Sequence, residues 1–315
     1  MPPIILDNTK RKTFRQCKKK YFLQHVKGLQ SDYGSTAIRY GIAWHGAMEG
    51  YYTHILKNGW PETTADELKI LESALVFAKK KWDAESAKKK FIDDYRNFNT
   101  LVDNFQAYLE YFKNDRLEMK IIGTETKFEV DILPENYEED KILRQLPSII
   151  FTGRIDLAVV YSYQNWLLDF KTTGWILDKV ILEANRSPQL IGYSYAGARK
   201  LNFEPNGCLC SFSHVGAYKS KKTGDYGSPK FDFRRVPQVY HPNELVQWKA
   251  DFIDTCREIN FSTEENYWPE RFDSCYVYGS CPYLKLCKQQ ESDFDSLNLE
   301  GFHEEFWDVL EDGVD

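Results

Sequence analysis

The chain lacks any long hydrophobic run. No window of its 315 residues approaches the roughly 20 apolar residues that a transmembrane helix needs. The opening Met-Pro-Pro-Ile-Ile-Leu-Asp also lacks the basic and extended apolar segments of a secretory signal. These absences argue against a membrane protein and against export. Without an export signal, the seven cysteines are expected to be metal ligands or buried thiols rather than disulfides.

The sequence also lacks the positive net charge that is common in proteins that bind nucleic acids, since its formal charge is −6. The distribution of charge is more informative than its sum. No Lys or Arg follows Lys288, where acids are frequent. In contrast, residues 9–20 contain no acid and carry Lys10, Arg11, Lys12, Arg15, Lys18, Lys19 and Lys20. The overall sign therefore does not exclude a polyanionic partner.

Hydrophobic periodicity predicts an α/β chain that can bury one large core or two modest ones. We divide it into helical residues 1–118, a core at 119–215, a region at 216–290 with a basic loop, a helix and three cysteines, and an acidic tail at 291–315. Strands are expected near 119–132, 149–161, 166–172 and 206–215, helices near 187–200 and 243–259, and an irregular loop at 134–147. These elements predict an α/β fold with helical additions at both ends, and the family resemblance described below implies a small mixed β-sheet flanked by helices.

Two short motifs flank the polar turn at 162–165. Gly153-Arg154-Ile155-Asp156 lies before it, and Leu168-Asp169-Phe170-Lys171 lies after it. Asp169 and Lys171 share a face because side chains alternate along a strand. If the loop has an even number of residues, Asp156 lies opposite one of them on that face. Carboxylate oxygens suit Mg²⁺ or Mn²⁺, and a neighbouring lysine can orient or deprotonate a metal-bound water. The alternative is an exposed hairpin with a cross-strand salt bridge.

The second chemical signature is the spacing Cys275-x5-Cys281-x5-Cys287. Three thiolates need a fourth ligand to complete a tetrahedral metal site or an iron–sulfur cluster, and Cys17 is the natural candidate. The alternative is a set of unrelated buried thiols. The remaining cysteines lack partners at suitable spacing and are expected in the core.

Taken together, these motifs resemble the PD-(D/E)XK nuclease superfamily, in particular its RecB-like branch, over residues 9–290. Gly41-Ile42-Ala43-Trp44-His45-Gly46 matches the family's upstream histidine helix. Glu125-Thr126-Lys127-Phe128-Glu129-Val130 matches its glutamate strand, and Gln189-Leu190-Ile191-Gly192-Tyr193 matches its Gln-x-x-x-Tyr helix. The cysteine pattern resembles AddB-type subunits and the CRISPR-associated exonuclease family. In those families the first two C-terminal cysteines are often two residues apart, whereas five residues intervene here.

The resemblance implies a metal-dependent deoxyribonuclease, expected to be an exonuclease that acts on DNA ends or single strands. It implies that His45, Asp156, Asp169 and the Phe170 carbonyl hold Mg²⁺ or Mn²⁺, that Lys171 positions water, and that Glu125 is an outer ligand or orienter. Gln189 and Tyr193 would hold Lys171 or the scissile strand. Cys17, Cys275, Cys281 and Cys287 would hold a 4Fe–4S cluster that ties both ends of the chain together, with zinc as the alternative occupant.

The resemblance also implies a cytoplasmic protein of a bacterial, archaeal or phage-infected cell, working in recombination, repair, phage replication or CRISPR adaptation. No Gly-x4-Gly-Lys-Ser/Thr motif is present, so DNA unwinding would require a helicase or recombination partner. The alternatives are a catalytically silent DNA-binding or interaction subunit and a zinc-stapled interaction protein. The complete His-Asp-Asp-Lys set argues against a silent subunit.

Three charged segments carry further expectations. The basic run at residues 10–20 is expected to follow the DNA backbone, with a solvated basic helix as the alternative. The loop at 217–230 is either a flexible hairpin tip or a second DNA contact, in which lysines grip phosphates and Tyr218 stacks on bases. The acidic tail either packs on the body, docks on a partner or occupies the DNA groove.

Overall fold

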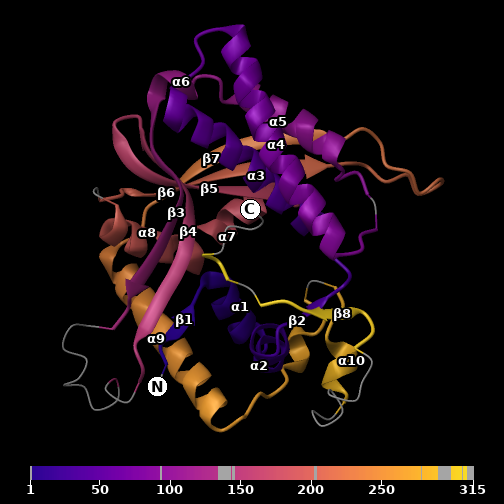
Figure 1. Ribbon diagram of the computed structural model, residues 1–315, viewed down its shortest axis with the longest axis vertical. Helices are drawn as coiled ribbons and strands as arrows, with labels where there is room; N and C mark the ends of the chain where they lie inside the picture. The colour runs from indigo at the N-terminus through magenta and orange to yellow at the C-terminus, as the bar shows by residue number, and fades with distance from the viewer. Residues whose placement is uncertain are drawn as a thin grey trace. The chain divides into compact units, whose positions relative to one another are not determined.

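The structure, a computed structural model, describes residues 2–92, 94–133, 143, 146–201, 204–277, 279–289, 299–306 and 308–310 (Figure 1). It contains two compact units, each assembled from separate parts of the sequence. The central unit comprises Gly34–Lys127 and Arg154–Pro242, and the terminal unit comprises residues up to Tyr33, Phe128–Gly153 and the described residues from Asn243 to Leu310. Most of the expected irregular loop at 134–147 and most of the acidic tail lie outside the described residues.

The sheet of the molecule is mixed, as predicted, with the strand order β1-β4-β5-β6-β7 and with β3 paired to β4. Strands β4 and β5 are antiparallel, β5 and β6 are parallel, and β6 and β7 are antiparallel. The strands are β1 (Ile4–Leu6), β3 (Met119–Asp131), β4 (Ile149–Tyr161), β5 (Gln164–Thr173), β6 (Gly207–Gly216) and β7 (Lys230–Gln238). The bounds of β3, β4, β5 and β6 agree closely with the four expected strands, because runs of β-branched and aromatic residues favour strands.

Helices cover both faces of the sheet in the central unit. One face carries α3 (Thr36–Asn58) and α5 (Phe98–Tyr111), whose Tyr52 and Tyr108 pack against Phe170. The other face carries α8 (Pro188–Lys200), where Gly197 lies against Leu167. The remaining helices of this unit are α4 (Thr64–Lys88), α6 (Asp115–Glu118) and α7 (Leu177–Ala184). None of the described helices is both long enough and apolar enough to cross a membrane.

Helices α3 and α4 pack closely through glycines. A Cβ atom on Gly50 would lie 2.8 Å from the Ser73 carbonyl oxygen, and one on Gly46 would lie 3.0 Å from that of Phe77. On the sheet side, a Cβ on Gly41 would lie 3.3 Å from Thr172 Oγ1. The small residues around His45 therefore serve two contacts. Gly41 allows α3 to approach the sheet closely, whereas Gly46 faces α4.

The terminal unit combines both ends of the described chain. Its elements are α1 (Asn8–Gln16), α2 (Lys18–Tyr21), a π-helix (Phe22–Val26), β2 (Leu29–Ser31), α9 (Pro242–Glu264), a 3₁₀ turn (Phe272–Ser274), α10 (Leu284–Cys287) and β8 (Phe302–Glu304). Strand β1 pairs with the start of β4, and β8 pairs with β2. The part of the acidic tail that forms β8 therefore packs on this unit. Helix α1 is capped by Asp7, whose side chain accepts a hydrogen bond from Lys10 N.

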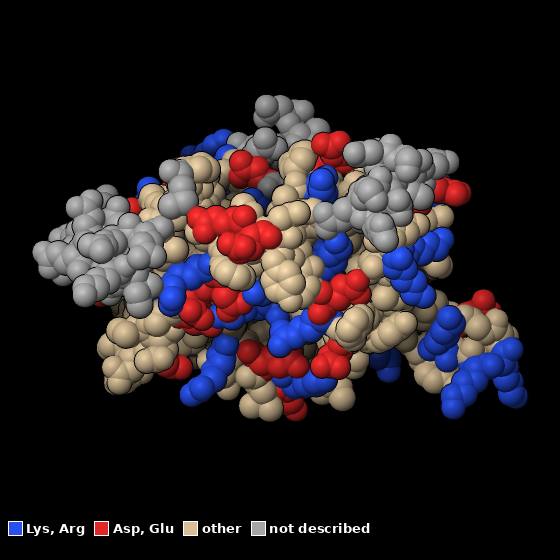
Figure 2. Space-filling model, turned by 90° about the horizontal axis from the view of Figure 1, so that it is seen from below, with Lys and Arg blue, Asp and Glu red and all other residues tan. Residues whose placement is uncertain are grey.

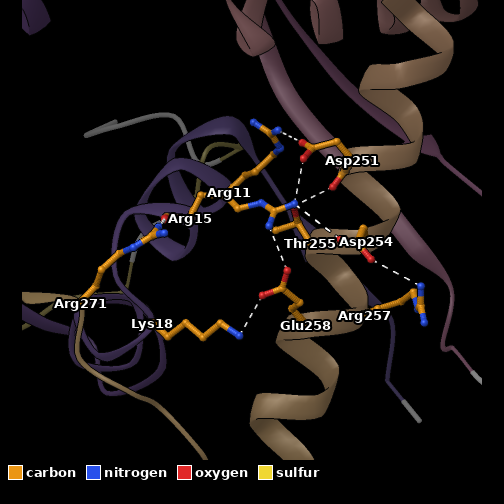
Figure 3. A network of polar contacts seen from close by, with 9 residues as sticks. All are labelled: Arg11, Arg15, Lys18, Asp251, Asp254, Thr255, Arg257, Glu258 and Arg271. Carbon is orange, nitrogen blue, oxygen red and sulfur yellow. Dashed lines mark hydrogen bonds and ion pairs between the residues drawn. The ribbon is translucent and has the colours of Figure 1, made fainter. Parts of the chain in front are cut away.

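The basic run forms ion pairs with α9 (Figure 3). Arg15 contacts Asp251 at 2.8 Å and Glu258 at 2.9 Å, Lys18 contacts Glu258 at 2.9 Å, and Arg11 also pairs with Asp251. Figure 2 shows acidic side chains interspersed among basic ones over the face that it presents. These three cations are thus matched by carboxylates within the unit, which weakens the expectation that this run follows a DNA backbone.

Candidate active site

The β4–β5 hairpin places Asp156 next to Asp169. Tyr161 pairs with Gln164, so the loop consists of Ser162 and Tyr163, whose φ values of 48° and 63° suit a two-residue turn. The ladder runs back to the pair Leu157–Leu168, which Asp156 and Asp169 directly adjoin. At that point Asp156 Oδ2 accepts a hydrogen bond from the Phe170 backbone N–H at 2.9 Å. The loop thus has an even number of residues, the condition under which Asp156 was expected to share a face with Asp169, and both carboxylates lie in one place.

Lys171 contacts two residues of the expected motif, and a third residue supports one of them. Its Nζ lies 2.9 Å from Asp169 Oδ1 and 3.0 Å from Gln189 Oε1. Gln189 Nε2 in turn donates to the Tyr193 hydroxyl at 3.0 Å. The Asp169 side chain is 2% exposed and that of Lys171 is 37% exposed. A nearly buried carboxylate thus anchors a lysine that still reaches solvent, and α8 fixes the position of its ammonium group.

His45 reaches the same carboxylates from α3. Its Nδ1 lies 3.3 Å from Asp156 Oδ2. Burial alone would lower the pKa of His45, but the charge and hydrogen bond of Asp156 outweigh burial and raise it. The structure therefore brings His45, Asp156, Asp169 and Lys171 together, as the family resemblance implies.

Glu125 completes the acidic side of the site. Burial and the Asp156 charge raise the pKa of Glu125 to about 8, although Arg154 Nε lies 2.9 Å from its Oε2. Glu125 has a φ of 46°, in the left-handed region that non-glycine residues rarely adopt. Residues held in this conformation are found most often at functional sites. Glu49 also acts on Glu125 electrostatically.

Arg154 and Glu49 are site residues to which the sequence analysis gave no role. Both leave a signal in the sequence. Arg154 lies two residues before Asp156, and therefore on the same face of β4, and Glu49 lies one helical turn after His45.

The charges of the other groups follow from their partners. Burial favours neutral Asp156, but His45, Lys171 and the Phe170 N–H stabilise the carboxylate and lower its pKa. Burial and the Asp156 charge raise the pKa of Asp169, against the effect of Lys171. Burial would lower the pKa of Lys171, but the Asp169 and Asp156 carboxylates reverse that effect and raise it. The Lys171 side chain is therefore an ammonium hydrogen-bond donor in this arrangement.

The donor set fits a hard divalent cation. Within the described ranges, no three His, Cys, Asp or Glu side chains converge closely enough to form a complete metal site. However, Asp169 Oδ2 is buried and has no hydrogen-bond partner. Burying a carboxylate oxygen without a hydrogen-bond partner carries a desolvation cost. Mg²⁺ or Mn²⁺ bound by this oxygen and the neighbouring carboxylate would remove that cost. Phe170 contributes only backbone atoms on this face, because its ring packs on Tyr52 and Tyr108 on the other face.

The four predicted cysteines line one cavity of about 90 Å³ in the terminal unit, which Lys20 and Arg271 also border. The Cys281 backbone N–H donates to the Cys275 carbonyl at 2.8 Å, which closes the loop between them. Among the described residues, these thiols do not converge closely enough to form a metal-binding group either. Burial, then Glu270 and the neighbouring Cys281 and Cys17, raise the pKa of Cys287 to about 12. A cation or cluster in the cavity would offset this effect and favour the Cys287 thiolate.

The other three cysteines, Cys208, Cys210 and Cys256, are buried, in agreement with their assignment to the core.

Comparison with known proteins gives a family but little detail. A crystal structure of a candidate exonuclease from Eubacterium rectale is similar at 13% identity and a TM-score of 0.46, covering 91% of this chain and 89% of that one. The protein SSO0001 is similar at 13% identity and a TM-score of 0.28, covering 78% and 84%. At these scores neither likeness carries a functional argument. No curated protein matches the chain. Residues 8–288, however, match the PD-(D/E)XK nuclease superfamily. This chain therefore belongs to the PD-(D/E)XK nuclease superfamily.

Proposed function

We propose that this protein is a metal-dependent deoxyribonuclease that hydrolyses phosphodiester bonds at the site of Asp156, Asp169 and Lys171. The observation that carries the proposal is the position of Lys171, whose Nζ lies 2.9 Å from Asp169 Oδ1 and 3.0 Å from Gln189 Oε1. A salt bridge between Lys171 and Asp169 with only a structural role would not need Gln189 as a second acceptor. It would also not need the 3.0 Å hydrogen bond that Gln189 donates to Tyr193. That support makes Lys171 a directed donor beside the two carboxylates.

His45, Asp156, Asp169 and the Phe170 carbonyl would hold Mg²⁺ or Mn²⁺. The bound ion would lower the pKa of a coordinated water and neutralise charge on the phosphate. The protein's own contribution is to fix the reacting groups in place. Lys171 donates from its ammonium group toward the attacking water or a phosphate oxygen, and Gln189 limits the rotamers of Lys171. Arg154, whose Nε lies 2.9 Å from Glu125 Oε2, orients the acidic side of the site.

We further propose exonuclease action on DNA ends or single strands, on the basis of the family resemblance, with any unwinding supplied by a partner. We also propose that the cavity lined by Cys17, Cys275, Cys281 and Cys287 holds a 4Fe–4S cluster, with zinc as the alternative occupant. A cross-link between residues so far apart would stabilise the fold by constraining the unfolded chain, by about 4–5 kcal/mol in the chain-entropy estimate. The cluster is expected to be structural, because the active-site residues belong to the other unit.

The test of the nuclease proposal is digestion of end-labelled single-stranded and double-stranded DNA with Mg²⁺, with Mn²⁺ and with EDTA. Cleavage that requires the metal and is lost in Lys171→Ala supports it. A ladder that shortens from one end identifies an exonuclease and its polarity. Absence of cleavage under all conditions, with DNA binding retained, would favour a catalytically silent DNA-binding subunit.

The cluster is tested separately. A brown protein with a broad visible absorbance band, which becomes colourless and unstable in Cys17→Ala but not in Cys256→Ala, supports a 4Fe–4S cluster. A colourless protein that contains zinc supports the alternative, and a coloured, stable Cys17→Ala variant would refute the four-cysteine site.

A further inference from the structure

Exposed aromatic side chains gather where the catalytic strand ends. Strand β5 carries Asp169 and Lys171 and ends at Thr173, after which Gly174, Trp175 and Ile176 lead into α7. Trp175 is 67% exposed and Ile176 is 75% exposed. The Trp175 backbone N–H donates to Thr173 Oγ1 at 3.0 Å, which fixes the start of this connection. Tryptophan is usually largely buried, so an ordered and exposed one beside a catalytic strand indicates a binding role.

The β6–β7 hairpin extends from the same edge of the sheet (Figure 1). Strands β5 and β6 are parallel and Thr173 pairs with His214, so their carboxyl ends lie side by side. Tyr95 joins the two segments, because its hydroxyl donates to the Val215 carbonyl at 3.2 Å and its ring centroid lies 5.1 Å from that of Tyr226 in the hairpin. Gly174 contacts the same Tyr95 hydroxyl, since a Cβ atom there would lie 3.4 Å from it. The segment that carries Trp175 and the β6–β7 hairpin therefore lie next to each other in the central unit.

This surface combines aromatic rings with cations. Tyr218 is 74% exposed and Tyr226 is 39% exposed. Lys179 Nζ lies 4.9 Å from the centre of the Trp175 ring, and Lys219 Nζ lies 5.0 Å from that of Tyr226. The hairpin also exposes Lys221, Lys222 and Lys230 against the single acid Asp225. Aromatic rings that stack on bases, next to ammonium groups that contact phosphates, are the usual means of binding unpaired strands.

We propose that this surface binds an unpaired DNA strand, with Trp175 stacking on a base close to the phosphate that is cleaved. We call it the stacking edge, formed by Trp175, Lys179, Tyr218, Lys219, Lys221, Lys222 and Tyr226. The inference rests on the proposed nuclease function. Trp175 follows Lys171 by four residues, at most about 14 Å of extended chain, so a strand that contacts both sites spans only a few nucleotides. A duplex hides its base faces in the stack, so the stacking edge selects unpaired DNA.

The test measures binding without cleavage. The full-length protein is titrated in EDTA against a labelled oligo(dT) of about 20 nucleotides and against a blunt hairpin duplex with the same number of phosphates. Trp175→Ala should weaken oligo(dT) binding about tenfold, as expected for one lost base–aromatic stack, and should change duplex binding less than twofold. Trp175→Phe should retain most of the affinity. Tyr163→Asn is the control, because Tyr163 is fully exposed at the opposite end of β5 and asparagine tolerates its φ of 63°.

Each outcome has one meaning. Unchanged oligo(dT) binding in Trp175→Ala overturns the stacking edge but leaves the nuclease proposal intact. Equal loss of oligo(dT) and duplex binding also overturns it, because it shows a general phosphate or structural role. No binding of oligo(dT) by the parent protein overturns it as well. Absence of metal-dependent cleavage together with Trp175-dependent oligo(dT) binding refutes the nuclease proposal and supports the stacking edge.

Discussion

Replacing Gln189 by leucine tests how Lys171, the proposed catalytic lysine, is held. Gln189 Oε1 accepts from Lys171 Nζ at 3.0 Å, and the leucine side chain keeps the volume but removes this acceptor. A hydrogen bond to a charged group is worth about 1.5–3 kcal/mol. If that amount is lost mainly in the transition state, kcat should fall about 10- to 150-fold. The KM for DNA should change little, because Gln189 carries no charge that binds phosphate.

Tyr193→Phe provides the graded comparison. It removes the hydroxyl that accepts from Gln189 Nε2 at 3.0 Å, and this neutral hydrogen bond is worth about 0.5–1.5 kcal/mol. We therefore expect kcat to fall about 2- to 13-fold, less than in Gln189→Leu and far less than in Lys171→Ala. Lys200→Ala is the control, because Lys200 is an exposed residue at the end of the same helix.

The assay is steady-state cleavage of an end-labelled oligonucleotide, with thermal unfolding recorded for each variant. The graded order of Lys171→Ala, Gln189→Leu and Tyr193→Phe supports the account. A Gln189→Leu enzyme with normal kcat, or a Tyr193→Phe enzyme that is more impaired than Gln189→Leu, would refute the reasoning that α8 positions the ammonium group.

Three further predictions concern stability and binding. Arg235 and Asp115 form an ion pair at 2.8 Å, and their side chains are only 5% and 8% exposed. Arg235→Met should therefore lower the free energy of unfolding, measured in urea, by about 3–5 kcal/mol, because it leaves Asp115 buried without its partner. Adding Asp115→Leu should restore part of this loss, whereas a further, additive loss in the double variant would contradict the coupling. Burial lowers the pKa of His25 from 6.5 to about 4, so the unfolded chain binds a proton at a higher pH than the folded chain does. The free energy of unfolding should therefore fall as the pH drops from 6.5 towards 4, by up to about 3 kcal/mol. His25→Leu should flatten this pH dependence, and an unchanged pH profile in that variant would contradict the prediction. Neutralising Lys221 and Lys222 together should reduce the slope of log affinity for single-stranded DNA against log salt by up to about 1.4, whereas an unchanged slope would show that neither lysine contacts a phosphate.

The sequence predicts the catalytic sheet well because local signals and long-range contacts agree there. The aromatic and β-branched runs define β4 and β5, and the alternation of side chains places Asp169 and Lys171 on one face. The turn was expected at residues 162–165, but only Ser162 and Tyr163 form it, because their positive φ values let the strands pair up to Tyr161 and Gln164. The positions of His45 and Gln189 follow from the family resemblance rather than from periodicity.

Other features could not be predicted because they depend on distant partners. The short strands β1, β2 and β8 have three residues each and exist through pairing with segments far away in sequence. The basic run has the same local sequence whether it meets DNA or protein, and only the fold shows that α9 supplies Asp251 and Glu258. Helix α4 is continuous from Thr64 to Lys88, although only Ala74–Trp82 has a clear apolar pattern, because its glycine-lined contact with α3 needs few large side chains.

The most direct test of the central claim is single-turnover cleavage of a labelled DNA strand in Mn²⁺ by the parent protein, Asp169→Asn and Lys171→Ala. We predict that the parent cleaves only when the metal is present. Both variants should bind the strand nearly as well but cleave it at least about 100-fold more slowly, the effect typical of losing a group that takes part in proton transfer or its positioning. Cleavage that persists in EDTA, or a Lys171→Ala variant that cleaves at nearly the parent rate, would contradict the account.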